Sequence, residues 1–354
     1  MSALSKAKKR SVLLAELFKA VDWKLLRSQR DADAETVLWI HHRYPQSWRS
    51  YLLHGDGIVK DLALAMALAK SGTRFQILTA NNISDQHARR IYYSIDRYNP
   101  LQASNYAAGL DAALTQLAEQ QNLLFPSVDE ARWWENKIYM HQRFEQLGIN
   151  SPRTEIADLH TTFEDLHARF GSRFLIKEPQ SCNSVGVHLV DGNASFLDTI
   201  AALGSSAVDQ YLVQELVDMH QDLRCTIIGG EIVHHYFRIN LGEEWRPTST
   251  RRGSRADFET FPEHSRAAIV EAANKTGLRS CAFDICWAGD DLTSAPIFLE
   301  VSPAFSPNPP PPPGWGDKSY ASFKEVLTGP DSYPRAQVKI IFDLHEKILD
   351  AWSA

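Results

Sequence analysis

Two apolar runs near the end of the chain constrain its fold more than any other feature. CAFDICW (281–287) and PIFLEVS (296–302) are separated by the short polar segment AGDDLTSA, so they are expected to form an antiparallel hairpin. A turn in the middle of that segment places Asp284 opposite Glu300. Because side chains alternate along a strand, Glu300 and Ser302 share one face. The hairpin therefore gathers two carboxylates and a hydroxyl.

Such a cluster needs a cation. Two unit charges about 4 Å apart repel by roughly 4 kcal/mol at an effective dielectric near 20. Either one carboxyl group stays protonated or a metal ion neutralises both. An all-oxygen ligand set suits Mg²⁺, which commonly completes its octahedron with water and substrate phosphates. Taken alone, the pattern fits two unrelated surface acids equally well.

The N-terminal third has the order of a parallel sheet. TVLWIHH (36–42) is typical of a buried strand, IVKDLALAMALAKSG (58–72) of a helix and RFQILTA (74–80) of a second strand. This βαβ order predicts parallel strands, extended by a helix at 106–120 and the run NLLFPS (122–127). A single helical pattern precedes them, from Leu4 to about Arg30.

The rest of the chain predicts antiparallel sheet. After about residue 172 short strands follow one another through tight turns, with helices expected at 262–277 and 335–352. Gly229 and Gly230 are expected to close one hairpin. The strand segments are FLIKEP, VGVHLV, YLVQEL, LRCTIIGG and EIVHHYFRI, followed by the acidic hairpin.

Composition and charge limit the classes of partner that this chain is expected to bind. The chain has 354 residues, a formal net charge of -6 and no uncharged apolar stretch long enough for a membrane span, so neither a nucleic acid nor a membrane is an expected partner. Small molecules are the expected partners. The cysteines form no CxxC pair, which predicts reduced packing residues and a cytoplasmic location. They are Cys182, Cys225, Cys281 and Cys286.

A lysine and a loop of small residues follow the strand FLIKEP. Lys177 ends that strand, and residues 181–186, which include Ser184, lead to the next one. Backbone amides of such a loop can surround phosphate oxygens while the ammonium group supplies the opposite charge. We expect a phosphate-binding lid here; an ordinary hairpin is the alternative reading.

These segments, in this order, resemble the ATP-grasp superfamily of carboxylate-amine ligases, most closely its glutathione-synthetase-like and glutamate-adding branch. The resemblance covers roughly 126–308 and rests on ENKIYMHQRFEQLGINSPRT, FLIKEP, YLVQELVDMHQDLR, YFRIN, CAFDI and FLEVS. It implies a mixed α/β and α+β ATP-grasp fold. The implied parts are an N-terminal parallel-sheet domain (1–125), a region with an antiparallel lid (126–213) and an antiparallel catalytic part (214–354).

The resemblance also implies roles for individual residues. The cofactors would be ATP and Mg²⁺, for which Mn²⁺ could substitute. Arg238 and Lys177 would contact the transferred phosphate, and the metal would be held by Asp284, Glu300 and Ser302, where the family usually has asparagine in place of the serine. ATP would be bound by Lys137, Lys177, Ser184, Gln214, Glu215, Leu216, Val217 and Asp222. Among these, Glu215 and the backbone of Leu216 and Val217 would face the adenine, and Asp222 would bind the ribose hydroxyls.

The expected activity is ATP-dependent ligation of a small-molecule carboxylate to an amine through an acyl phosphate. Arg251, Arg252 and Arg255 are candidate ligands for an acidic substrate, although a solvated basic loop is as plausible. HGDGIVKD (54–61) could bind a substrate group at a helix N-terminus, with a plain connecting loop as the favoured reading. The alternatives are a kinase-like enzyme of the same fold without amine transfer and a non-catalytic nucleotide-binding protein. A homodimer is considered, without a direct sequence signal.

Overall fold

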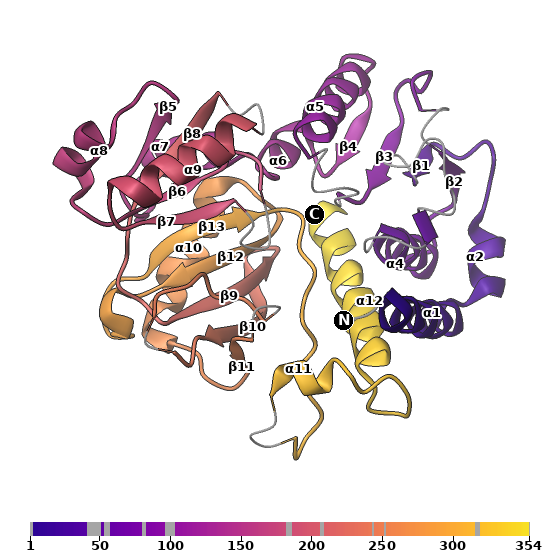
Figure 1. Ribbon diagram of the computed structural model, residues 1–354. Coiled ribbons are helices and arrows are strands. Elements are labelled where there is room, and N and C mark those ends of the chain that lie inside the picture. The colour runs from indigo at the N-terminus through magenta and orange to yellow at the C-terminus, as the bar shows by residue number, and fades with distance from the viewer. Residues whose placement is uncertain are drawn as a thin grey trace.

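The computed structural model contains three sheets in its described residues, and Figure 1 shows their arrangement. An N-terminal α/β layer lies on one side of the molecule, and two antiparallel sheets lie on the other. The described residues are 3–40, 51–52, 57–79, 83–95, 103–181, 186–205, 209–242, 244–250, 253–315 and 319–353.

The N-terminal sheet is parallel, as the βαβ pattern predicts, with strand order β2-β1-β3-β4. Its strands are β1 (Thr36–Trp39), β2 (Phe75–Leu78), β3 (Arg90–Tyr93) and β4 (Leu123–Phe125). The sequence pattern did not indicate β3, which occupies a central place next to β1. A strand of four residues is too short to show a periodic pattern, so β3 is recognisable only by its pairing with its neighbours.

Helices cover both faces of this sheet. Leu38 on β1 points into a core with α1 (Ala3–Ala20), α4 (Gly57–Lys70) and α12 (Tyr333–Ser353). Trp39, the next residue, points into a second core with α5 (Ala103–Glu119) and α6 (Val128–Arg132). The alternation of side chains thus produces a three-layer sandwich. Its first layer is completed by the last helix of the chain.

The prediction of a single helix from Leu4 to about Arg30 is wrong. The structure divides this segment into α1 and α2 (Trp23–Gln29). The Asp22 carboxylate accepts hydrogen bonds from the backbone amides of Lys24 and Leu25, at 3.0 and 2.9 Å. An aspartate in this position caps the N-terminus of a new helix, so Asp22 is the residue from which this break could have been predicted.

A smaller antiparallel sheet has strand order β5-β8-β6-β7. One face is covered by α8 and α9, which pack on Phe174, Ile176 and Val213. Lys177 and Gln214 alternate with these residues and therefore project from the opposite face. The elements are β5 (Thr154–Asp158), α8 (Phe163–Phe170), β6 (Phe174–Lys177), β7 (Val187–Val190), α9 (Asn193–Ser205) and β8 (Gln210–Glu215).

A larger antiparallel sheet has strand order β11-β10-β9-β12-β13. Phe144 of α7 and Ile269 of α10 pack on its inner face, together with Cys225 and Cys281 as free buried thiols. The opposite face carries Asp222 and other charged side chains. The elements are α7 (Lys137–Leu147), β9 (Gln221–Ile228), β10 (Glu231–Ile239), β11 (Arg255–Asp257), α10 (Arg266–Thr276), β12 (Ser280–Cys286), β13 (Ile297–Ser302) and α11 (Tyr320–Phe323).

The two expected hairpins are confirmed. Gly229 and Gly230, with φ of 59° and 80°, join β9 to β10, and β12 pairs with β13. Asp284 lies opposite Glu300, and a bulge follows between Asp284 and Ile285. Within the described part of the chain, none of the helices has the length and apolar character required to cross a bilayer.

Candidate active site

A cavity of about 590 Å³ is walled by the charged face of the larger sheet, the free face of the smaller sheet and the start of α7. Its size is that of a nucleotide or small-ligand site. It collects most of the residues that the sequence singled out. They are Lys137, Lys177, Gln214, Glu215, Leu216, Val217, Asp222, Arg238, Asp284, Glu300 and Ser302.

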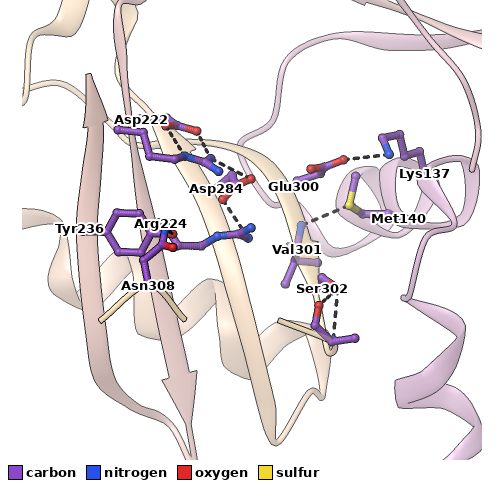
Figure 2. A network of polar contacts seen from close by, with 12 residues as sticks. Lys137, Met140, Asp222, Arg224, Tyr236, Asp284, Glu300, Val301, Ser302 and Asn308 are labelled. Atoms are coloured by element: carbon purple, nitrogen blue, oxygen red, sulfur yellow. Dashed lines mark hydrogen bonds and ion pairs between the residues drawn. The ribbon is translucent and has the colours of Figure 1, made fainter. Parts of the chain in front are cut away.

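A chain of alternating charges crosses the larger sheet (Figure 2). Arg238 donates from Nε to Oδ1 of Asp222 at 2.9 Å, with a second contact from Nη2 to Oδ2. The same Nη2 lies 2.9 Å from Oδ2 of Asp284, whose Oδ1 lies 3.0 Å from Nη1 of Arg224. The strand register produces this order, because Arg238 pairs with Asp222 and Arg224 with Asp284.

Burial makes this network electrostatically strong. The side chains of Asp222 and Arg238 are 2% and 12% exposed. Burial raises the pKa of Asp222 despite the opposing charge of Arg238. For Arg238, burial favours the neutral form, but the carboxylates of Asp222 and Asp284 raise its pKa well above the ordinary value. Arg238 is therefore a fixed cation. The role of Asp222 toward ribose stays a prediction, since its carboxylate holds Arg238 here.

Lys137 and Lys177 supply positive charge beside Glu300. Nζ of Lys137 lies 3.0 Å from Oε1 of Glu300 and also donates to the carbonyl of Ser181. Burial alone would raise the pKa of Glu300, but the charges of Lys137 and Lys177 lower it to about 2. Burial lowers the pKa of Lys177 to about 8, partly offset by Glu300. Glu300 is thus an anion at neutral pH.

The acidic pair fits a hard divalent cation. Asp284 and Glu300 face the cavity from adjacent strands, and Oδ1 of Asp284 is buried without a hydrogen-bond donor of suitable geometry. Carboxylate oxygens are the ligands Mg²⁺ prefers, with phosphate oxygens and water completing its shell. The described residues contain no group of three or more acidic, histidine or cysteine side chains placed to hold a metal. The protein would therefore supply only part of the coordination.

Ser302 is engaged elsewhere. Its hydroxyl donates to the carbonyl of Ala304 at 2.9 Å and accepts from the Ala304 amide at 3.2 Å (Figure 2). The hydroxyl thus closes a local turn after β13. Its part in metal binding stays a prediction.

The segment that links the two antiparallel sheets borders the cavity. Glu215 accepts from the amide of Arg153 at 2.8 Å, and its own amide donates to the Arg153 carbonyl at 3.0 Å. Gln214 donates to the hydroxyl of Thr154 at 2.8 Å and lies 3.3 Å from Nε2 of His141. Leu216 follows Glu215 and lines the cavity with its neighbour Val217. These contacts fix the segment in which adenine binding is predicted.

Two site residues were missed by sequence reasoning. Arg224 belongs to the charge network and lies two residues after Asp222, so alternation along β9 was a usable signal. His141 lies four residues after Lys137, hence on the same face of α7. Burial, together with the charge of Lys177, lowers the pKa of His141 to about 3. It is therefore a neutral neighbour of Gln214.

Of the other predicted residues, three lie outside the described part of the chain and one is placed away from the cavity. Ser184, Arg251 and Arg252 lie outside the described residues. Arg255 is exposed on the edge strand β11 and does not line the cavity, so the geometry gives no support to its role as a substrate ligand. Of the expected lid, Ser181 lines the cavity and Gly186 accepts at its carbonyl from the Glu178 amide at 2.8 Å.

Comparison with known proteins bears on this geometry. Residues 134–305 match the RimK-like ATP-grasp domain. A probable alpha-L-glutamate ligase from Halorhodospira halophila is 29% identical over 170 residues, 47% of this chain and 54% of that protein. The chain thus spans about half the length of the curated relatives it matches.

Solved structures share the fold over most of the chain. The D-alanine–D-alanine ligase from Bacillus anthracis complexed with ATP has a TM-score of 0.55 at 12% identity, covering 92% of this chain and 98% of that one. The ATP-grasp ligase PsnB, complexed with a phosphomimetic variant of its minimal precursor, Mg and ADP, has a TM-score of 0.54 at 14% identity, covering 91% and 100%. The expected ATP-grasp fold is confirmed.

Proposed function

We propose that this chain, which carries a RimK-like ATP-grasp domain over 134–305, is an ATP-dependent ligase that joins a carboxylate to an amine. The observation that carries the proposal is the meeting of Asp284 and Glu300 with Lys137, Lys177 and Arg238 in one cavity. Acids for a cation and fixed positive charges for phosphates are the two requirements of phosphoryl transfer.

In the proposed reaction a carboxylate oxygen attacks the γ-phosphorus of ATP, and ADP leaves. The acyl phosphate is then attacked at carbon by an amine; a C–N bond forms, inorganic phosphate departs and the amine loses a proton. Lys137, Lys177 and Arg238 balance the phosphate charges and orient them. Arg238 is suited to this because Asp222 fixes its guanidinium group. The segment 214–217 would receive the base.

Mg²⁺ held by Asp284 and Glu300 would draw charge from the phosphate oxygens. The chain itself keeps Glu300 ionised, since Lys137 and Lys177 lower its pKa despite its burial. We propose that Mn²⁺ can replace Mg²⁺, because it accepts the same oxygen ligands.

The test is a mass-spectrometric screen of acids and amines with ATP and Mg²⁺. L-glutamate is the first candidate substrate, because the matched relatives are named as alpha-L-glutamate ligases. Amine-dependent release of ADP and phosphate with a condensed product supports the ligase. ADP with a phosphorylated acid but no condensation would indicate the kinase-like alternative, and no turnover would indicate the non-catalytic one.

A matched pair of variants tests the site. Glu300→Gln keeps size and removes the charge, and should lower turnover by at least about a hundredfold if the carboxylate stabilises the transferred charge. Glu271→Gln makes the same change at an exposed position of α10 and should leave turnover intact. A Glu300→Gln enzyme as active as its parent removes the metal assignment.

Further expectations belong to the same proposal. We propose boundaries near residues 125 and 213, a cytoplasmic location and small-molecule substrates. Fractionation of the source cells tests the location, and light scattering after size-exclusion chromatography tests the homodimer. The boundary near 125 is tested by limited proteolysis, because linkers between domains are cut first. The boundary near 213 falls inside β8, where Val213 is buried, so it would divide the two antiparallel sheets without an exposed linker.

A further inference from the structure

A buried lysine from the N-terminal layer reaches the cavity. Among the described residues that precede Trp133, Lys60 on α4 is the one that lines it. Lys60 is 5% exposed, and its Nζ donates to the carbonyl of Ile95 at 3.3 Å. In the described part of the chain no carboxylate lies within ion-pair distance of this ammonium group. The N-terminal layer therefore presents an uncompensated cation to the cavity.

The neighbouring acid does not neutralise it. Asp61 is directed to the hydroxyl of Tyr51, 2.7 Å away, and to Ser94. Lys137, Arg224 and Arg238 of the cavity wall differ in this respect, because each of them lies against a carboxylate. Burying a cation without a counterion is costly, so such a group is retained most readily where an anion comes to meet it.

The lining of a second cavity shows where Lys60 lies relative to Asp284 and Glu300. Lys60 also lines an adjoining cavity of about 40 Å³ together with Ala304, Phe305 and Pro307. This segment directly follows β13, the strand of Glu300, and lines the main cavity too. Lys60 therefore lies on the side of the site where the chain leaves the acidic pair.

A second lysine and a group of polar side chains also line the main cavity, and one of them, Asn308, directly follows Pro307, which lines both cavities together with Lys60. Nζ of Lys324 donates to the hydroxyl of Thr250 at 3.1 Å. Asn308 donates to the hydroxyl of Tyr236 at 2.9 Å and lies 3.4 Å from that of Thr250. Gln337 lines the cavity from α12, which runs between the N-terminal layer and the larger sheet (Figure 1). Neutral donors and lysines together suit a carboxylate.

We propose that Lys60 and Lys324 form a subsite for a carboxylate of the substrate that is not the group being joined. This rests on the proposed ligase function. The ligase would accordingly prefer a substrate with an additional carboxylate, such as an acidic amino acid or the C-terminus of a peptide. Lys60 acts as a specificity-determining residue, and the N-terminal layer contributes to substrate choice through it.

Binding and turnover are measured separately. Calorimetric titrations of protein loaded with Mg²⁺ and a non-hydrolysable ATP analogue use L-glutamate and L-aspartate, and their amides L-glutamine and L-asparagine, as probes. The parent should bind an acid at least about tenfold more tightly than its amide, the range expected of a charge-assisted hydrogen bond. Lys60→Met should abolish this preference, and Lys60→Arg should retain part of it.

The control is Lys70→Met on the same helix, which removes an exposed lysine paired with Glu346 and should leave the preference intact. Inorganic phosphate as a further probe separates a carboxylate site from a general anion site, and tighter binding of phosphate than of the acids overturns the proposal. So does an acid preference that survives Lys60→Met, or a parent that binds acids and amides alike. A protein that prefers acids to amides but has no ligase activity refutes only the proposed function. A protein that has ligase activity but no preference for acids refutes only the subsite.

Discussion

Removing Arg238 tests the electrostatic core of the site. Arg238→Met leaves the carboxylates of Asp222 and Asp284, which are 2% and 10% exposed, without their shared guanidinium group. Asp284 keeps Arg224 at 3.0 Å, whereas Asp222 loses both of its contacts from Arg238. Breaking a buried pair in this way costs about 3–5 kcal/mol of unfolding free energy, because a charge stays buried without a partner.

The loss should depend on pH. Burial already raises the pKa of Asp222, and removing Arg238 raises it further. A carboxyl with a raised folded-state pKa stabilises the fold at low pH and loses that contribution as pH rises through this pKa. The penalty of Arg238→Met should therefore be larger at about pH 7.5 than at about pH 5. Adding Asp222→Asn should recover part of it.

The assay is urea unfolding followed by tryptophan fluorescence. Arg132→Met is the matched control, since Arg132 also lies between two aspartates, at 2.9 Å from Asp111 and 3.0 Å from Asp129, but with 41% of its side chain exposed. An exposed pair of this kind contributes about 0.2–1 kcal/mol. The reasoning is refuted if both variants lose the same stability, or if the loss in Arg238→Met does not change with pH.

Three further predictions concern the cavity. Since the pKa of Lys177 is about 8, affinity for ATP should fall as pH rises through that value, and Lys177→Arg should remove this dependence in a binding titration. Glu300, with its pKa lowered to about 2, stabilises the fold above its ordinary pKa and loses this contribution in acid, so acid titration should unfold Glu300→Gln less steeply than the parent. Gly186→Ala should lower the free energy of unfolding by more than about 1 kcal/mol and weaken ATP binding, because φ is +71° and the new Cβ would lie 2.7 Å from Cδ of Glu178. Gly192→Ala is the control and should change neither, because a Cβ at Gly192 would meet no atom within 4 Å.

Local patterns explain what could be predicted. The pairing of Asp284 with Glu300 follows from two strands and the turn between them, and the turn at Gly229 and Gly230 from the tolerance of glycine for positive φ. Such features depend on residues close together in the sequence.

Long-range contacts explain what could not. The motif HGDGIVKD (54–61) favours a connecting loop, and its alternative reading, a substrate group bound at a helix N-terminus, does not single out Lys60, which α4 brings to a cavity built mainly from residues after 130. The Ser302 hydroxyl suited a metal in the sequence pattern, whereas the turn to Ala304 decides its contacts in the structure. Arg255 was expected in a loop and is instead the first residue of an edge strand, which holds it outside the cavity.

The position of α12 has a consequence for biosynthesis. Val338, Ile341 and Leu349 of this last helix belong to the same core as Leu17 of the first helix and Leu64 of α4. During translation α12 therefore leaves the ribosome long after the two helices that it covers. We expect the apolar surfaces of α1 and α4 to stay open to chaperones until α12 has emerged.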